Sequence, residues 1–347
     1  MIFLAISLSA CAGGGVTAAS SWPGIIVEGE TAYLSYNQHV YAINISDGKE
    51  KWRFPSEANS KISFYAAPIL TSDGQLLAGG YDHVLYSLDP EKGTENWSFK
   101  EAKNRYVGSP LASETGIFAP TADDHLYALD LKGQLSWSFQ TQGAQWAAPV
   151  TDPGCKCVYL ASMDHRLYAI DSQTGKAKWQ TNDLGGSMVG TPAYSPDGML
   201  YIGTFNSEMV AVNAESGGIL WQKPTDGWVW GGPALKEGKL YFGDLSGSFY
   251  AMETNGSIDW KIKPDGPIAQ TPLLAEEAIY FTTQAGSIYA IDYAGKIRWN
   301  QTIGGKLYTS PALAGDKILV APTGLDAYLI ALDTNGTQVW QFIPEKK

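Results

Sequence analysis

Apolar residues along this chain alternate with polar ones or form runs of four or five, and Gly, Asp, Asn and Ser interrupt them at short intervals. This pattern predicts short β-strands joined by tight turns, because successive strand residues point to opposite faces of a sheet. The pattern recurs every 39 to 45 residues, marked by tryptophans at positions Trp52, Trp97, Trp137, Trp179, Trp221, Trp260, Trp299 and Trp340. A fixed period of this size indicates one supersecondary unit copied eight times.

Two further features recur with the same period as the tryptophans. A strand-like tetrapeptide with a small second residue precedes each tryptophan, at Tyr41–Asn44, Tyr86–Asp89, Tyr127–Asp130, Tyr168–Asp171, Val210–Asn213, Tyr250–Glu253, Tyr289–Asp292 and Ile330–Asp333. A proline lies further upstream in every copy, at Pro23, Pro68, Pro110, Pro149, Pro192, Pro233, Pro272 and Pro311. Eight complete units therefore run from about Trp22 to Trp340.

The fourth copy shows how one unit is built. Its apolar runs predict strand A within residues 146–151, strand B at 157–162, strand C at 166–171 and strand D at 176–180. Four antiparallel strands form a sheet with two faces to bury, which radial repetition achieves. We predict an all-β, eight-bladed β-propeller over residues 22–347, with the proline-led A strands at the central channel because proline suits an edge strand.

Each predicted C–D hairpin contains a glycine that supplies the positive φ of a tight turn: Gly48, Gly93, Gly133, Gly175, Gly217, Gly256, Gly295 and Gly336. The eight tryptophans fall on strand D, and we expect their rings to pack between adjacent blades. We assign them to the fold and to no ligand.

The element from Ala42 to Trp52, repeated for example from Ala169 to Trp179, resembles the tryptophan-docking repeat of the pyrroloquinoline-quinone (PQQ) β-propeller family. The resemblance covers residues 22–340. One branch of that family, the quinoprotein dehydrogenases, holds PQQ and Ca²⁺ under a disulfide of adjacent cysteines. Another, the BamB-like lipoproteins, has eight bare blades and binds proteins without a cofactor. The chain looks like the second branch, since Cys155 and Cys157 are not adjacent and its blades lack long insertions.

Residues 1–21 differ from the repeats. An apolar run ends in Leu8-Ser9-Ala10-Cys11, which resembles the lipobox of bacterial lipoproteins, although the run is short and lacks a basic start. We expect Cys11 to carry a lipid anchor and residues 12–21 to form a flexible tether. The alternative is an apolar tail before a domain.

Charge and motifs exclude several functions. The net charge of −11 argues against nucleic acid, which requires a basic surface. No hydrolase, zinc-protease, phosphate-loop or dinucleotide fingerprint occurs in a supporting context, so we assign no catalytic residue and no cofactor. For Cys155 and Cys157 we favour two small residues in a turn over a small-ring disulfide or half of a metal site, since no second pair exists.

The D–A loops and B–C turns should emerge at one end of the ring. Several aromatic and basic residues lie there, just before the strand-A prolines and out of phase with the docking tryptophans: Tyr65, Arg105, Tyr106, Trp146, Trp228, Trp230 and Tyr308. Such residue types are enriched in binding hot spots, so we predict a partner-binding face. The alternative is that they pack the tops of neighbouring blades.

Polar residues on the predicted B–C turns should lie at the same end of the ring. The histidines His39, His83, His125 and His165 occupy what we take as equivalent turn positions, too far apart to share a metal, and we assign no metal site. Acids accompany them: Asp82, Asp123, Asp124, Asp164, Glu208 and Asp244. We therefore expect an acidic face suited to a basic or apolar protein partner.

Together these features predict an extracytoplasmic, lipid-anchored scaffold that binds proteins or peptides in the cell envelope, with a role such as outer-membrane protein assembly. We expect a monomer bound to a bacterial membrane through its N-terminal lipid only. The alternative is a PQQ-dependent dehydrogenase or a small-ligand sensor that uses the central channel.

Overall fold

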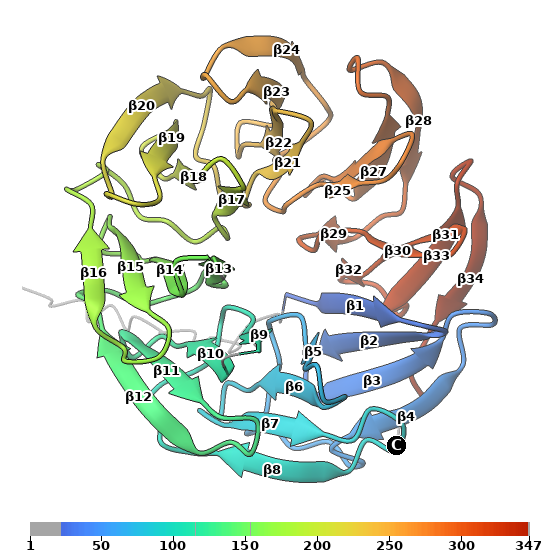
Figure 1. The fold of residues 1–347 in the computed structure, drawn as a ribbon. Coiled ribbons are helices and arrows are strands. Elements are labelled where there is room, and N and C mark those ends of the chain that lie inside the picture. Colours follow the sequence, from blue (N-terminus) through green and yellow to red (C-terminus); the bar gives the residue numbers. More distant parts are fainter. Residues whose placement is uncertain (1–21, 115, 153, 346–347) are drawn as a thin grey trace, which may run out of the picture.

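The computed structural model describes residues 22–114, 116–152 and 154–345. These residues form a closed ring of eight antiparallel four-stranded sheets (Figure 1), which confirms the predicted fold. Cys11 and the predicted tether lie outside the described residues. No helix in the described ranges is long and apolar enough to cross a membrane.

Each blade uses four strands in chain order, from the channel outward. The first four blades are β1 to β16, at Gly24–Glu28, Thr31–Tyr36, His39–Asn44, Glu50–Phe54, Ile69–Leu70, Leu76–Gly79, Leu85–Leu88, Glu95–Phe99, Leu111–Ser113, Gly116–Pro120, His125–Leu129, Leu135–Gln140, Val150–Asp152, Cys157–Ala161, Leu167–Asp171 and Ala177–Gln180. Blades 5 to 7 are β17 to β28, at Ala193–Ser195, Met199–Thr204, Glu208–Asn213, Ile219–Pro224, Ala234–Lys236, Lys239–Gly243, Phe249–Glu253, Ile258–Ile262, Leu273–Leu274, Ile279–Thr282, Ser287–Ile291 and Ile297–Thr302.

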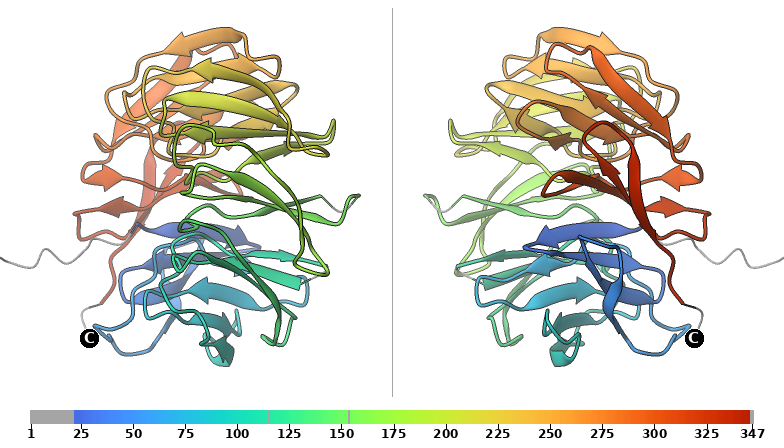
Figure 2. Two further views of the ribbon diagram at one scale, coloured as in Figure 1. Left: turned by 90° about the vertical axis from the view of Figure 1, so that its left-hand side faces the viewer. Right: turned by 90° about the vertical axis from the view of Figure 1, so that its right-hand side faces the viewer.

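Blade 8 contains β30, β31, β33 and β34, at Ala312–Ala314, Lys317–Val320, Leu329–Asp333 and Gln338–Phe342. A short extra pair, β29 at Lys306–Leu307 and β32 at Pro322–Thr323, lies beside it. No blade among the described strands borrows a strand from the other end of the chain, so the ring closes through contacts between blades 8 and 1 and not through a shared sheet. The strands run between two faces of the ring, where the turns gather (Figure 2).

The core lies between blades. Strands B and C are almost fully buried along their length, as β2 and β3 show, whereas outer strands such as β12 alternate between half-buried and exposed residues. Most clusters of buried side chains combine residues of two successive blades, for example Tyr201 of blade 5 with Phe242 of blade 6. Neighbouring blades therefore stabilise each other, as expected of a repeat that cannot bury both faces alone.

The docking tryptophans link successive blades in a recurring way. The Trp52 ring lies over Gly93 in the C–D turn of blade 2, and its Nε1 donates to the Pro90 carbonyl at 2.9 Å. Trp340 repeats this contact on Gly48 and the Ile45 carbonyl of blade 1, at 2.8 Å, and so closes the ring. A Cβ at Gly93 would stand 2.5 Å from the Trp52 ring. The turn glycines are thus required by this close approach as well as by their positive φ.

The same contact between blades explains the small residue of each tetrapeptide. Ala42 pairs directly opposite Trp52 across strands C and D, and the equivalent pairing recurs in all eight blades, with Ser87 replacing alanine in blade 2. A bulge follows each pair, where the ladder shifts register. Trp97 departs from the pattern because its Nε1 donates to Gln75 of its own blade, and Gln75 in turn reaches the Leu131 carbonyl of blade 3.

Two details of the fourth blade differ from the sequence-based expectation. Strand A begins at Val150, not within residues 146–149, and the residues just before that segment, Ala144 and Gln145, bond to B–C turns instead of a strand ladder. Cys155 and Cys157 form a disulfide, so the interpretation as two unlinked small residues is wrong. Lys156 between them adopts a left-handed φ of 53°, and the two Cα atoms lie 5.2 Å apart, a separation that a disulfide can span.

Candidate protein-binding surface at the channel mouth

Every D–A loop from blade 2 to blade 7 is hydrogen-bonded between two B–C turns. In blade 4, the Gln145 amide donates to the Thr121 carbonyl of blade 3 at 3.1 Å, and the Met163 amide of blade 4 donates to the Ala144 carbonyl at 3.0 Å. The same two bonds recur around the ring, and β29 with β32 forms the corresponding pair in blade 8. The D–A loops and B–C turns therefore form one end of the ring, which we call the channel mouth, and the backbone there is fixed.

This pairing gives the residues before each strand-A proline an alternating orientation. The residue four positions before the proline is buried in the blade and fully shielded from solvent, at Phe64, Tyr106, Gln145, Met188, Val229, Ile268 and Leu307. The residue three positions before the proline lines the channel instead, at Tyr65, Val107, Trp146, Val189, Trp230, Ala269 and Tyr308. Adjacent residues of an extended segment point to opposite sides, which accounts for the difference.

Large rings and small side chains alternate at the channel-lining position. Tyr65, Trp146, Trp230 and Tyr308 come from blades 2, 4, 6 and 8, whereas the intervening blades 3, 5 and 7 supply valine or alanine. This alternation gives each ring room over its smaller neighbours. Together with Trp22, these four residues form a set that we call the channel-mouth rings.

Trp22 belongs to the set by contact, since it lies only one residue before Pro23. Trp22 reaches across the channel from blade 1. Its ring centroid is 5.4 Å from that of Trp230 and 6.0 Å from that of Tyr308. Trp146 and Trp230 approach to 6.5 Å. Sequence reasoning did not single out Trp22, because it occupies a different position relative to its proline.

The rings enclose two connected hollows. One of about 240 Å³ is lined by all five channel-mouth rings together with glycine, alanine, serine and threonine residues from all eight blades. A smaller one of about 150 Å³ lies between Trp22, Trp230 and Tyr308 and is completed by Leu245 and Gln284 from B–C turns. No charged side chain lines either hollow among the described residues. The mouth is therefore an uncharged depression in which aromatic rings stand among small and hydroxyl-bearing residues.

Two of the predicted residues lie at the rim of this depression. The Arg105 guanidinium lies 4.9 Å above the ring of Tyr81, and Tyr81 stacks on Tyr65 at 3.7 Å. Burial raises the pKa of Tyr81 to about 12 against the opposing effect of Arg105. Trp228 is 51% exposed and stacks on Phe205 at 5.1 Å. Phe205 was missed from sequence, although it occupies the same B–C turn position as Tyr81.

Tyr106 requires a correction. It is four residues before Pro110, and its side chain is fully buried beneath Gly79, with a hydroxyl that has no partner among the described residues. Its distance of four residues from the proline, where blades 2 and 4 to 8 also have a buried residue, is the sequence signal for this burial. We leave Tyr106 out of the surface considered below.

The expected acidic face is wrong for most of its acids, whose carboxylates are bonded within the fold. Asp82, Asp164 and Asp244 accept hydrogen bonds from tyrosines of strand C, at 2.5 Å from Tyr86, 2.6 Å from Tyr168 and 2.8 Å from Tyr250 respectively. Asp244 is fully buried. These carboxylates hold the B–C turns, so they are not a free acidic surface.

Asp123 shows the electrostatic consequence. Burial alone raises its pKa, but hydrogen bonds from Thr121, the Lys103 amide and Tyr127, with the nearby His125, hold the pKa below the usual aspartate value. Hydrogen bonding to the charged form favours that form. Asp123 therefore stays ionised and ties the D–A loop to its turn.

The histidines do not all share one position. His83 and His165 take the left-handed turn position, each with φ of 69°, whereas His125 follows Asp124, which takes that position with φ of 67°. His39 is likewise shifted, because Asn37 is the left-handed residue in blade 1. The prediction of equivalent positions is wrong for His39 and His125. Within the described part of the chain, no cluster of three potential metal ligands occurs.

Trp146 has a polar atom that the fold leaves unused. Its Nε1 is buried and lacks a hydrogen-bond partner among the described residues. By contrast, the docking tryptophans use their Nε1 atoms, as in Trp179 to the Ala214 carbonyl at 3.0 Å. A buried donor without an acceptor is uncommon in native proteins.

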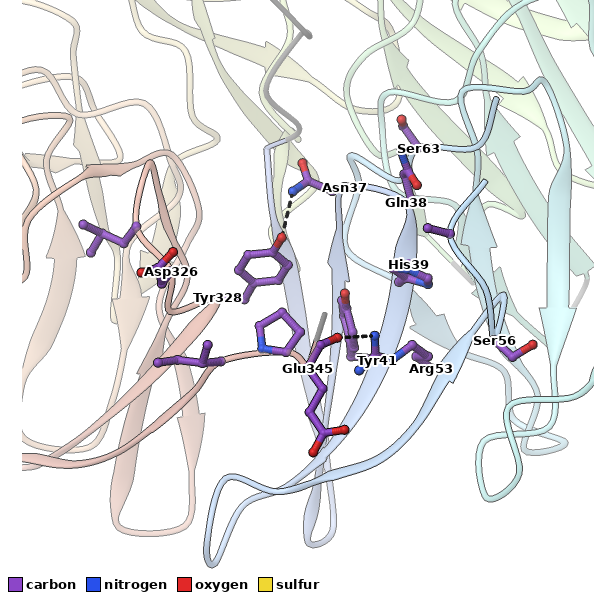
Figure 3. A pocket seen from close by; sticks show the side chains of 14 residues that line it. Asn37, Gln38, His39, Tyr41, Arg53, Ser56, Ser63, Asp326, Tyr328 and Glu345 are labelled. Carbon is purple, nitrogen blue, oxygen red and sulfur yellow. Dashed lines mark hydrogen bonds between the residues drawn. The ribbon is translucent and has the colours of Figure 1, made fainter. Parts of the chain in front are cut away.

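A larger hollow of about 590 Å³, lined in part by charged residues, lies at the seam between blades 1 and 8 (Figure 3). Arg53 donates to both carboxylate oxygens of Glu50, at 2.7 and 2.5 Å, and to the Glu345 carbonyl at 3.2 Å. Tyr328 stacks on Tyr36 at 3.9 Å across the seam. These groups bond to one another across the junction of the chain ends, so they stabilise ring closure, and we assign no ligand to the hollow.

Comparison with known proteins agrees with this architecture. The sequence profile described as "Outer membrane protein assembly factor BamB" matches residues 36–187, 164–274 and 268–346, which together cover most of the chain. The chain belongs to this family of PQQ-repeat β-propellers. The predicted relationship is thereby confirmed.

Relatives in this family carry different names. Outer membrane protein assembly factor BamB of Yersinia pestis is 24% identical over 242 residues, covering 66% of this chain and 60% of that protein. Tetrathionate hydrolase of Acidithiobacillus ferrooxidans is 26% identical over 200 residues, covering 57% of this chain and 36% of the hydrolase. The chain thus spans about a third to three fifths of the length of these relatives.

A solved structure of BamB from Moraxella catarrhalis superposes with a TM-score of 0.71 at 18% identity, covering 93% of this chain and 95% of that one. At that identity the likeness concerns the fold. The family and the fold are therefore established, and the activity has to be argued from the site.

Proposed function

We propose that this protein is a scaffold that binds a protein or peptide at the channel mouth, where it carries out no catalysis. The observation that carries the proposal is the set of channel-mouth rings, which lines an uncharged hollow on a hydrogen-bonded backbone. Tryptophan and tyrosine offer large apolar area with few rotatable bonds, which suits recognition. The partner would insert an apolar side chain between these rings.

The role we propose is in the assembly of outer-membrane proteins. Support comes from relatives that carry the name of an assembly factor and from one solved structure with that name over nearly the whole ring. We propose an extracytoplasmic location with a lipid anchor at Cys11. The Cys155–Cys157 disulfide supports a compartment outside the cytoplasm, because disulfides persist in oxidising environments.

The binding proposal is tested by capture from envelope extracts. Wild type and a Trp146→Ala/Trp230→Ala double variant serve as baits, with Leu220→Ala/Ile258→Ala on exposed D-strand positions as the matched control. We expect one or more partners to be lost only with the channel-mouth variant. Identical partner sets for all three baits, with unchanged melting temperatures, would contradict the proposed surface.

The anchor is tested separately. Replacing Cys11 by Ser should release the protein from membranes into the soluble fraction, while its circular dichroism spectrum stays unchanged. Continued membrane association of Cys11→Ser after a salt wash would exclude a lipid at this residue as the anchor.

The alternative function, with PQQ and Ca²⁺ in the channel, fits the lining poorly. PQQ is a polycarboxylate and Ca²⁺ prefers carboxylate oxygens, but no described residue that lines the channel hollows is charged. We derive no reaction through this cofactor. A saturable change in tryptophan fluorescence at micromolar PQQ and Ca²⁺ would favour the alternative over the scaffold.

A further inference from the structure

The Cys155–Cys157 disulfide occupies the A–B turn of blade 4, away from the channel mouth. The other seven A–B turns contain no cysteine, and several close with a two-residue turn, as between Lys236 and Lys239. In blade 4 the ladder is already formed by the pairing of Asp152 with Cys157. A cross-link that encloses one residue adds little to stability, because a short loop has little entropy to lose. The repeat thus shows that the fold does not need this bond.

The surroundings of the disulfide form a small site. Both cysteines line a hollow of about 210 Å³ together with Tyr159, Lys178 and Trp179. Cys155 is half-buried, whereas Cys157 is 3% exposed, so Cys155 is the more accessible of the two. The Lys178 ammonium donates to the Cys155 carbonyl at 2.6 Å, and the Tyr159 hydroxyl lies 3.4 Å from the Cys155 sulfur. The site therefore combines the more exposed cysteine with a cation and a hydroxyl, and the carboxylates of Asp152 and Glu215 line the same hollow.

We propose that this pair carries out thiol–disulfide exchange with a cysteine-containing polypeptide. A thiolate of the substrate attacks the Cys155 sulfur, the bond between the two cysteines breaks, and its electron pair leaves with the Cys157 sulfur, which takes up a proton. A second thiol of the substrate then attacks the mixed disulfide and releases Cys155 as a thiol. The substrate leaves with a new disulfide, and two electrons and two protons remain on the pair. An oxidised thiol compound such as glutathione disulfide restores it.

Lys178 has a positioning role in this exchange. A nearby cation stabilises thiolates and speeds their departure or attack. Lys51 provides a natural comparison, since it precedes Trp52 as Lys178 precedes Trp179 and donates to Thr31 of its own blade at 2.6 Å. Lys51 has no disulfide beside it.

The first experiment uses the full chain with Cys11→Ser, so that only the pair can react. The probe is a reduced peptide with the sequence Cys-Gly-Pro-Cys, added in excess at pH 7.5 without denaturant. We expect one peptide to be oxidised for each protein disulfide lost, measured by mass spectrometry after alkylation, with a change in the emission of Trp179. A disulfide that survives an hour of this treatment and reacts only in urea would overturn the proposal.

Single-cysteine variants test which of the two sulfurs is the more accessible for exchange. In the same background, Cys157→Ser should form a mixed disulfide with glutathione disulfide about tenfold faster than Cys155→Ser, because rate follows access. Lys178→Gln should slow peptide oxidation several-fold, because the cation that stabilises the thiolate is lost. Lys51→Gln should leave the rate unchanged. Equal rates in the two cysteine variants would overturn the assignment to Cys155, and equal rates in the two lysine variants would overturn the role of Lys178.

Discussion

The docking tryptophans and the channel-mouth rings use the same kind of side chain for different purposes. The first recur once in every blade, meet a glycine in the next blade and, as in Trp179, donate their Nε1 to a carbonyl. Four of the second come from alternate blades, and Trp22 of blade 1 joins them; four of the five contact another ring of the set, and Trp146 has an unused Nε1. A ring whose contacts repeat with the fold serves the fold, whereas rings that break the repeat are available for recognition.

The strongest test of this difference is to remove one ring of each kind. Trp179→Ala should lower the free energy of unfolding by about 3 kcal/mol, because it leaves a cavity between blades 4 and 5. Trp146→Ala should cost about 1 kcal/mol or less, since one side of its ring faces the hollow. Urea denaturation of both variants measures the difference. Equal losses would mean that the channel-mouth rings also hold the blades together.

A glycine pair separates the docking contact from backbone conformation. Gly93 and Gly74 both have positive φ, of 68° and 82°, but a Cβ at Gly74 meets nothing within 4 Å. Gly74→Ala should cost about 1 kcal/mol from the left-handed backbone alone. Gly93→Ala should cost about 2 kcal/mol more, because its Cβ collides with Trp52. Similar melting temperatures for the two variants would show that the Trp52 ring moves aside without cost.

Two tyrosines test the difference between the buried position and the channel-lining position before the strand-A prolines. Tyr106→Phe should stabilise the protein by about 1 kcal/mol, because it removes a buried hydroxyl without a partner. Tyr308→Phe, at the channel-lining position, should stay within about 0.5 kcal/mol of wild type. Thermal unfolding compares the two. A destabilised Tyr106→Phe would indicate that an internal water satisfies the hydroxyl.

The smallest expected effect concerns pH. The lowered pKa of Asp123 means that its stabilising contribution is present above about pH 4 and is lost as pH falls through its folded-state pKa. Asp123→Asn should therefore cost about 1 kcal/mol at pH 7 and progressively less below pH 4. Melting temperatures of both proteins at pH 7 and pH 3 give the comparison. A constant difference would mean that the charge of Asp123 makes no contribution.

Much of this molecule could be predicted from sequence because a repeat supplies eight versions of each position. The tryptophans, the turn glycines and the prolines all led to the observed blades. Errors occurred where one blade departs from the rest, as with the disulfide in blade 4 and the shifted histidines of blades 1 and 3. A unique feature has no second copy against which its register can be checked.

The candidate surface was predictable to a smaller extent. Trp146 and Trp230 were found because they interrupt the period, but the burial of Tyr106 and the participation of Trp22 were not. Burial depends on the bonds between D–A loops and B–C turns, which orient alternate residues. The acids of the turns were misjudged for a similar reason, since their tyrosine partners lie four to six residues away on strand C.

The sequence by itself determined the number of blades, the strand order within each and the residues that join them, since these follow from local patterning repeated at a fixed period. Only the tertiary structure decided which rings meet in the channel. Trp22, Trp230 and Tyr308 are far apart along the chain and come together because eight blades close a ring. Ring closure is a property of all eight joints at once, and no single repeat contains it.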